Sequence, residues 1–110
     1  MTHSEKIRAL NIAFWRNPHI NGRLMLTRGV AEMGTLFVHR CLLTLAHYDA
    51  WNEDNDPHGE ADMCTFDVDG LKVWAKLDCY DKYDQNNGSE DPADPDKTLR
   101  VGTILFPEEY

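Results

Sequence analysis

The chain has 110 residues and a mass of 12.7 kDa, and we expect residues 1–110 to form a single domain around one core. A hydrophobic fraction of 42% excludes wholesale disorder, and no run approaches the ~18 apolar residues that a membrane span requires. The net charge of -8 disfavours direct nucleic-acid binding, because carboxylates repel phosphates, unless the basic N-terminal half of the chain forms a separate patch.

The cysteines and the N-terminus indicate the compartment. Cys41, Cys64 and Cys79 are odd in number and form no CxxC pair, which argues against a disulfide framework and against a thiolate zinc site. The N-terminus lacks the basic-then-apolar order of a signal peptide. We therefore expect a cytoplasmic protein with no cofactor and no contact with a membrane.

The first expected element is a helix over residues 2–15. Thr2 and Glu5 have the spacing of a capping box, and apolar residues recur on one face of the segment. Asn17 and Pro18 are expected to end this helix.

Two further elements are expected before the first acidic segment. RLMLT, residues 23–27, is short and apolar enough for a strand. Residues 33–51 fit either a buried strand or a helix, and we choose the helix because apolar residues follow helical spacing over more than the length of a strand. The acidic run that follows contains Pro57 and Gly59, which preclude regular structure.

The strongest local pattern predicts a β-hairpin. MCTFDV and LKVWAKLDCY alternate and are joined by Asp69 and Gly70, a favoured two-residue turn. This register predicts a core face with the pairs Val68–Leu71, Phe66–Val73 and Cys64–Ala75. The other face, which mixes charge with one large aromatic residue and is therefore partly solvated, has the pairs Asp67–Lys72, Thr65–Trp74 and Met63–Lys76.

A long loop, residues 81–96, precedes a third strand of this sheet, TLRVGTILF. Neither side of that strand is cleanly polar, which favours a central position. We predict an α+β fold with two helices packed on one face of a three- or four-stranded antiparallel sheet.

The acidic run suggests one possible chemistry. His58, Glu60 and Asp62 occupy alternate positions and could converge on a metal or a proton-transfer site. The zinc deaminase signature is excluded because no PCxxC follows, and the EF-hand is excluded by spacing. We assign no catalytic and no metal-binding residue, and keep as an alternative a metal-dependent or acid–base enzyme built on Glu60, Asp62 and Asp78, with His58.

Several motifs resemble a known family. They are NDPHGEAD (55–62), LKVWAKLDCYD (71–81), GSEDPADPDKTLRVGTI (88–104) and the terminal EEY (108–110). The pattern, NDPxGExD, DPADPxxTxRV and EEY, resembles a family of small bacterial proteins catalogued as a domain of unknown function and common on plasmids and prophages. Ala61 stands where that family has His, which weakens a catalytic interpretation of the first motif.

We expect a small acidic, non-enzymatic interaction protein. The type of genetic element that the resemblance implies favours an anti-CRISPR or anti-restriction inhibitor, a DNA mimic that blocks the nucleic-acid-binding surface of a host protein or ribonucleoprotein effector. The expected partner-binding residues are Asp54, Asp56, Glu60, Asp84, Glu90, Asp91, Asp94, Asp96 and Trp74.

The DPADP segment also suggests a structural role. Pro92 and Pro95 stiffen the turn, which lowers the entropic cost of presenting its carboxylates. We expect Arg100, as a partner of Asp94, Asp81 or Asp78, to seat this loop against the hairpin. Asp78, Asp81 and Arg100 are therefore assigned as loop-seating residues.

Overall fold

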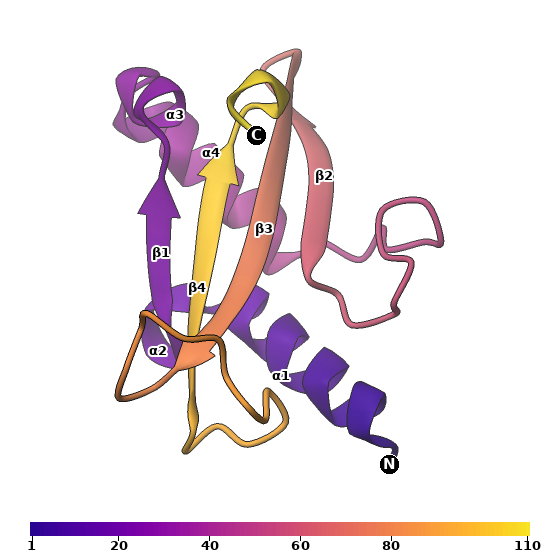
Figure 1. The fold of residues 1–110 in the computed structure, drawn as a ribbon. Helices are drawn as coiled ribbons and strands as arrows, with labels where there is room; N and C mark the ends of the chain where they lie inside the picture. The colour runs from indigo at the N-terminus through magenta and orange to yellow at the C-terminus, as the bar shows by residue number, and fades with distance from the viewer.

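The computed structural model describes the backbone of residues 1–110 and the side chains of all but residues 20 and 21. One layer is a four-stranded sheet in the order β1-β4-β3-β2, and the long helices α1 and α4 both lie behind it (Figure 1). The elements are α1 (His3–Arg16), α2 (Pro18–Asn21), β1 (Arg23–Leu26), α3 (Arg28–Glu32), α4 (Thr35–Ala46), β2 (Met63–Val68), β3 (Leu71–Asp81), β4 (Thr98–Leu105) and the 3₁₀ turn η1 (Pro107–Glu109).

Helix α1 begins with the expected capping box. The Thr2 hydroxyl accepts from the Glu5 N–H at 3.1 Å, and the Glu5 carboxylate accepts from the Thr2 N–H at 3.2 Å. These bonds satisfy two backbone donors that an uncapped helix leaves free. The helix ends at Arg16, one residue before Asn17, as the Asn-Pro pair predicts.

The helix expected over residues 33–51 exists but is shorter, because α4 ends at Ala46. An arginine of α1 ends it: Arg16 Nη1 donates to the carbonyls of Leu45 at 3.2 Å and Tyr48 at 2.7 Å. Beyond this point the chain turns so that the Tyr48 ring packs on Trp51, with centroids 4.9 Å apart. Contacts with α1, which is distant in the chain, therefore end α4. The spacing of apolar residues within the segment does not indicate such contacts.

The hairpin prediction is confirmed in its register. Val68 pairs with Leu71 at the turn, and every other predicted pair is present. Asp69 and Gly70 have φ of 53° and 80°, so both turn residues lie in the left-handed region that a type I′ turn requires.

The sheet is mixed, so the expectation of a purely antiparallel sheet is wrong. β4 is central as predicted, and it pairs antiparallel with β3. On its other side it pairs parallel with β1, where Arg23 lies opposite Val101 and Leu26 opposite Ile104. Tertiary packing decides which strand a four-residue strand pairs with and in which direction. The alternation of residues within the strand does not indicate its partner.

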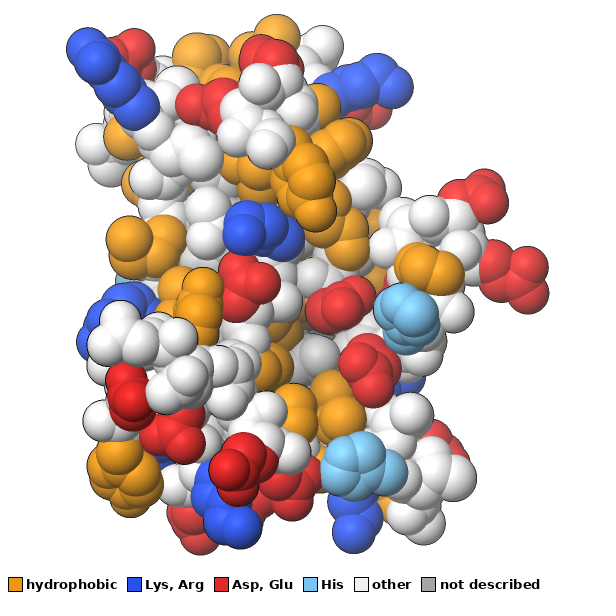
Figure 2. Space-filling view, viewed as in Figure 1, with side chains coloured by type: hydrophobic (Ala, Val, Ile, Leu, Met, Phe, Trp, Pro, Cys, Tyr) orange, Lys and Arg blue, Asp and Glu red, His pale blue; other side chains and the backbone are white. Residues whose placement is uncertain are grey.

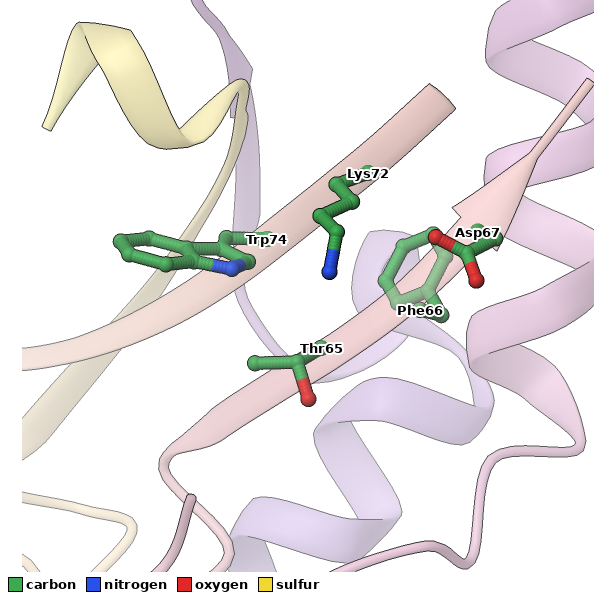
Figure 3. Close-up of a pocket in the computed structure, with 5 residues that line it drawn as sticks. All are labelled: Thr65, Phe66, Asp67, Lys72 and Trp74. Carbon is green, nitrogen blue, oxygen red and sulfur yellow. The ribbon is translucent and has the colours of Figure 1, made fainter. Parts of the chain in front are cut away.

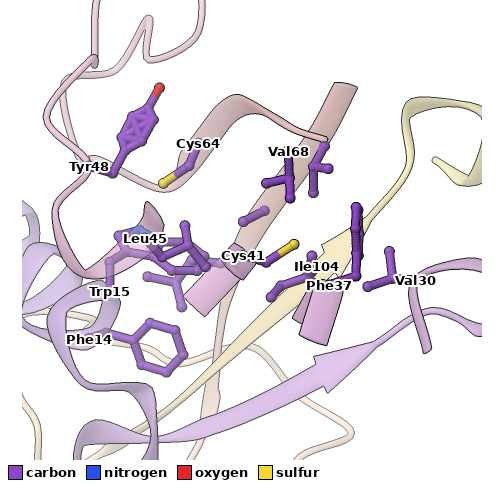
Figure 4. Packing of buried hydrophobic residues seen from close by; sticks show 13 residues of the cluster. Phe14, Trp15, Val30, Phe37, Cys41, Leu45, Tyr48, Cys64, Val68 and Ile104 are labelled. Atoms are coloured by element: carbon purple, nitrogen blue, oxygen red, sulfur yellow. The ribbon is translucent and has the colours of Figure 1, made fainter. Parts of the chain in front are cut away.

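The core lies between the sheet and the two long helices (Figure 4). Phe14 and Trp15 of α1 are fully buried and meet edge to face, with centroids 5.1 Å apart. Gly102 of β4 allows α1 to approach, since a Cβ there would lie 2.6 Å from the Phe14 ring. None of the helices that the structure describes combines the length and the apolar character needed to cross a bilayer.

Candidate functional site

The sheet presents an open face on the side away from α1 and α4. Side chains alternate along each strand, so every second residue points toward the helices and the core. The residues between them point to the open face. Figure 2 views it directly and shows apolar side chains around a central basic and acidic pair. The open face comprises Arg23, Met25, Met63, Thr65, Asp67, Lys72, Trp74, Lys76, Asp78, Tyr80, Leu99, Val101 and Thr103.

Strand β3 supplies the centre of the open face. Lys76 Nζ lies 3.0 Å from Asp78 Oδ2, and this hydrogen bond raises the pKa of Lys76. Both side chains are more than a third exposed, so the pair contributes little to stability and remains accessible. Trp74, two residues before Lys76 in the same strand, borders a shallow hollow of about 160 Å³ together with Lys72 of β3 and Thr65 of β2 (Figure 3).

The last residues of the chain extend this surface. Glu109 accepts from Thr27 Oγ1 at 2.7 Å, from the Phe106 N–H at 2.9 Å and from the Gly29 N–H at 3.0 Å, and these bonds lower the pKa of its carboxyl. The next residue, Tyr110, is thereby held with its ring 5.7 Å from Trp74 at 74°. The EEY motif thus anchors one aromatic ring beside the open face.

Two larger hollows lie on the two sides of the Lys76–Asp78 pair. One, of about 410 Å³, is floored by Met25, Leu99 and Val101 of the adjoining strands β1 and β4. The other, of about 350 Å³, lies toward the first acidic loop, which we define as residues 49–62. Its lining includes Asn55, Pro57, His58, Asp62, Met63, Lys76, Leu77, Asp78 and Tyr110.

Asp56 of the first acidic loop is structural, which corrects its assignment to a partner surface. Its residue is only 6% exposed, and its carboxylate receives Arg8 Nη1 at 2.8 Å. It also accepts from the N–H groups of Glu60 at 3.1 Å and Ala61 at 3.0 Å, so its oxygens are committed to the fold. Asp54 is exposed as expected, whereas Glu60 is half-buried.

The carboxylates of the second acidic loop, residues 82–97, are divided between two roles. Asp84, Asp91 and Asp94 each accept a backbone N–H two residues ahead, at 2.9–3.2 Å, and so fix their own turns. Glu90 and Asp96 are exposed. This loop therefore has a defined shape, and two of its carboxylates point freely into solvent.

Arg100 contacts the second acidic loop, but not through an acid, which corrects the expected pairing. Its Nη2 donates to the carbonyl oxygen of Pro92, and its Nε donates to Asn11 Oδ1 of α1 at 2.8 Å. Asp78 lies on the opposite face of the sheet, since its register partner is Val101. The buried guanidinium is thus compensated by neutral oxygens, and burial lowers its pKa.

Asp81 shapes the start of the second acidic loop. One of its carboxylate oxygens accepts from the N–H groups of Tyr83 at 2.9 Å and Asp84 at 3.0 Å. This bonding turns the chain as it leaves β3. The residue therefore acts on the loop locally and not as a partner of Arg100.

The structure brings together only some of the residues on which the alternative function, an enzyme, would depend. His58, Asp62 and Asp78 line the hollow of about 350 Å³, whereas Glu60 does not. Burial raises the pKa of Asp62, the charges of Asp56 and Asp78 add to this, and His58 opposes it. Among the described residues no group of three His, Cys, Asp or Glu is placed to hold a metal ion.

Several residues of this surface are not singled out by the sequence, although Trp74 is. The hairpin register places Lys76 on the partly solvated face, and that mixed composition is the available signal. Tyr110, by contrast, reaches the open face only through Glu109 and Thr27, which are far apart in the chain.

A comparison with family models finds one match that covers most of the chain. The model described as protein of unknown function (DUF3768) matches residues 26–109. No curated protein and no solved structure matches the chain.

Proposed function

Because the chain belongs to the DUF3768 family, we propose a function from its surface: a small acidic, non-enzymatic interaction protein of the cytoplasm. In this proposal it protects a mobile genetic element as an anti-CRISPR or anti-restriction inhibitor. It occupies the basic nucleic-acid-binding surface of a host protein or ribonucleoprotein effector.

The fixed carboxylates of the second acidic loop are the observation that carries this proposal. Asp91 and Asp94 bond to their own backbone, and Arg100 links the Pro92 carbonyl of the loop to Asn11 of α1. The exposed Glu90 and Asp96 therefore project from a loop whose backbone is hydrogen-bonded into a defined turn. A partner binds such a display at a lower cost in conformational entropy.

The negative charge of the chain favours binding to a basic, nucleic-acid-binding surface. Duplex DNA carries one negative charge per ~1.7 Å, and its binding sites on proteins are lined by Lys and Arg. In Figure 2 acidic side chains gather along the lower and right-hand margins, over the two acidic loops. With a net charge of -8 the protein competes with DNA for the same basic side chains.

Competition for DNA binding tests the proposal. A labelled DNA duplex is bound to purified restriction and CRISPR effector complexes, and the protein is added at several salt concentrations. We expect release of DNA from at least one effector, with an inhibition constant that weakens as salt rises. Failure to displace DNA from any effector would contradict the proposal.

Charge reversal locates the contact. Glu90→Lys with Asp96→Lys changes two carboxylates that do not hold the loop, and we expect inhibition to weaken by about tenfold or more. The matched control is Glu32→Lys with Glu108→Lys, two exposed carboxylates at the other end of the sheet (Figure 1). Equal inhibition by the two double variants would exclude the second acidic loop as the contact.

One observation favours a second function, an acid–base enzyme built on Asp62 and Asp78. Both line one hollow with His58, and the raised pKa of Asp62 is typical of a proton donor. The test is turnover of chromogenic esters, glycosides and phosphoesters. Turnover that Asp62→Asn abolishes would support this function, and its absence on every substrate would remove the support.

A further inference from the structure

The open face of the sheet is a second surface that the proposed function leaves unused. Half-buried Leu99 and Val101 of β4 and the half-exposed Met25 of β1 form an apolar floor beneath the hollow of about 410 Å³. A hollow of this volume lies in the range that binds a side chain cluster or a small ligand. Apolar side chains gathered over two adjoining strands mark an interaction site more often than scattered ones do.

The second hollow faces the first across β3. The two lie on opposite sides of the Lys76–Asp78 pair, so their centres are separated by about two strand spacings, or ~10 Å. Tyr110 borders the second hollow, and its ring lies against Trp74 with the centroids 5.7 Å apart. Glu109, the preceding residue, makes three hydrogen bonds that position the chain just before this ring.

Charge complementarity identifies what this face would accept. The half-buried Asp62 carboxylate lies near the charges of Asp56 and Asp78, and the compensation comes from its own backbone N–H and from His58. Asp56 is already bonded to Arg8, and Asp78 to Lys76. An added cation beside Asp62 would therefore relieve a charge that the fold only partly compensates.

We propose that the open face docks a segment of the protein partner that carries an apolar side chain beside an arginine or lysine. The apolar side chain enters the hollow floored by Met25, Leu99 and Val101. The basic side chain enters the hollow of Asp62 and Asp78, where the Tyr110 ring adds a cation–π contact. This inference rests on the proposed function, since it describes how the same partner is held.

Other occupants fit less well. In the second hollow the carboxylates of Asp62 and Asp78 stand against the ammonium of Lys76 and would repel phosphates, which disfavours nucleic acid there. A second copy of the chain also carries a net charge of -8 and would be repelled at close range. A basic, partly apolar protein segment matches both hollows and the charge between them.

A peptide that combines both chemistries tests the proposal. The probe is acetyl-LGRLGRLG-amide, and binding is followed by ¹H–¹⁵N chemical shifts of the full chain. We expect shifts at Asp62, Lys76, Asp78 and Val101, with binding weakened about tenfold when citrulline replaces arginine or glycine replaces leucine. Shifts confined to the acidic loops, or equal affinity for the citrulline peptide, would overturn the proposal.

Variants of the face separate binding from folding. Asp62→Asn and Val101→Lys are each expected to weaken the peptide about fivefold or more. Asp67→Asn, an exposed carboxylate on the same face, is the control and is expected to bind as the native chain does. If Val101→Lys fails to fold, Asp62→Asn alone decides, because unchanged affinity there contradicts the proposal.

The outcomes distinguish this inference from the proposed function. Displacement of DNA by the native chain and equally by Asp62→Asn would overturn the docking site and leave the function standing. Peptide binding without displacement from any effector would do the reverse. Sedimentation of the native chain as a dimer that Val101→Lys dissociates would assign the open face to a second copy and overturn the proposal.

Discussion

Asp56→Ala removes the carboxylate that organises the first acidic loop. The native side chain receives two backbone N–H groups, those of Glu60 and Ala61, and one N–H of Arg8. Its side chain is 3% exposed, whereas that of Arg8 is 36% exposed. The alanine variant therefore leaves two backbone donors without an acceptor, while Arg8 remains partly hydrated.

The expected loss can be worked out from these bonds. A hydrogen bond to a charged group contributes about 1.5–3 kcal/mol, so two backbone donors give roughly 3–6 kcal/mol. Water can enter a loop at the surface and replace part of this, and we expect the free energy of unfolding to fall by about 3 kcal/mol. In a domain of this size that corresponds to a decrease in Tm of about 12–20 °C.

Urea unfolding followed by tryptophan fluorescence measures the change, with thermal melting by circular dichroism as the second probe. Asp54→Ala is the matched control, because Asp54 is exposed in the same loop and its loss is expected to cost under about 0.5 kcal/mol. Equal midpoints for the two variants would refute the assignment of Asp56 as the organiser of the loop.

Three further predictions concern charge, packing and thiols. Burial and neighbouring carboxylates raise the pKa of Asp62, so its ionised form costs stability at pH 7. At pH 7 we expect Asp62→Asn to be more stable than the native chain, measured as a higher urea midpoint. The difference should shrink as the pH falls through the raised pKa of Asp62 toward the ordinary value of 3.8. A difference in midpoint that stays constant with pH would contradict this. Gly102→Ala places a Cβ 2.6 Å from the Phe14 ring and should lower the unfolding free energy by about 1–3 kcal/mol, measured by urea unfolding, whereas an unchanged midpoint would mean that α1 shifts freely. Burial raises the pKa of Cys41 to about 11 and that of Cys64 further, so iodoacetamide at pH 8 should label neither until urea is added, as mass spectrometry can check; prompt labelling of the native chain would refute their burial.

The parts of the fold that rest on local chemistry could be predicted from the sequence. The Thr2–Glu5 capping box and the Asp69-Gly70 turn each need only neighbouring residues, and both are present in the structure. Parallel pairing of β1 with β4 could not be predicted, because it depends on the packing of α3, α4 and the hairpin, which separate the two strands along the chain. The early end of α4 likewise depends on Arg16, a residue of another helix.

The candidate site divides in the same way. The mixed face of the hairpin was visible as alternation, so Trp74 could be placed on it from the sequence. The sequence does not indicate whether an acid faces solvent or the backbone. Asp56 and Asp54 are the same residue type in one loop, and Asp56 is set apart by the N–H groups of Glu60 and Ala61 and by Arg8, which the fold brings to it. Arg100 contacts the second acidic loop as expected, but its partners are carbonyl and amide oxygens, which composition does not single out.

The position of β4 in the middle of the sheet has a consequence for biosynthesis. β4 is the last strand to be made, yet β1 and β3 both pair with it, and the bond from the Gly29 N–H to Glu109 spans 80 positions of the chain. A nascent chain on the ribosome can form α1 and the hairpin, but it cannot close its core until β4 has emerged. Until then β3 has an unpaired flank beside Val73 and Ala75, side chains that are fully buried in the finished protein. Interrupted synthesis would therefore release a chain with an exposed adhesive strand edge, the kind of species that aggregates or is removed by proteases.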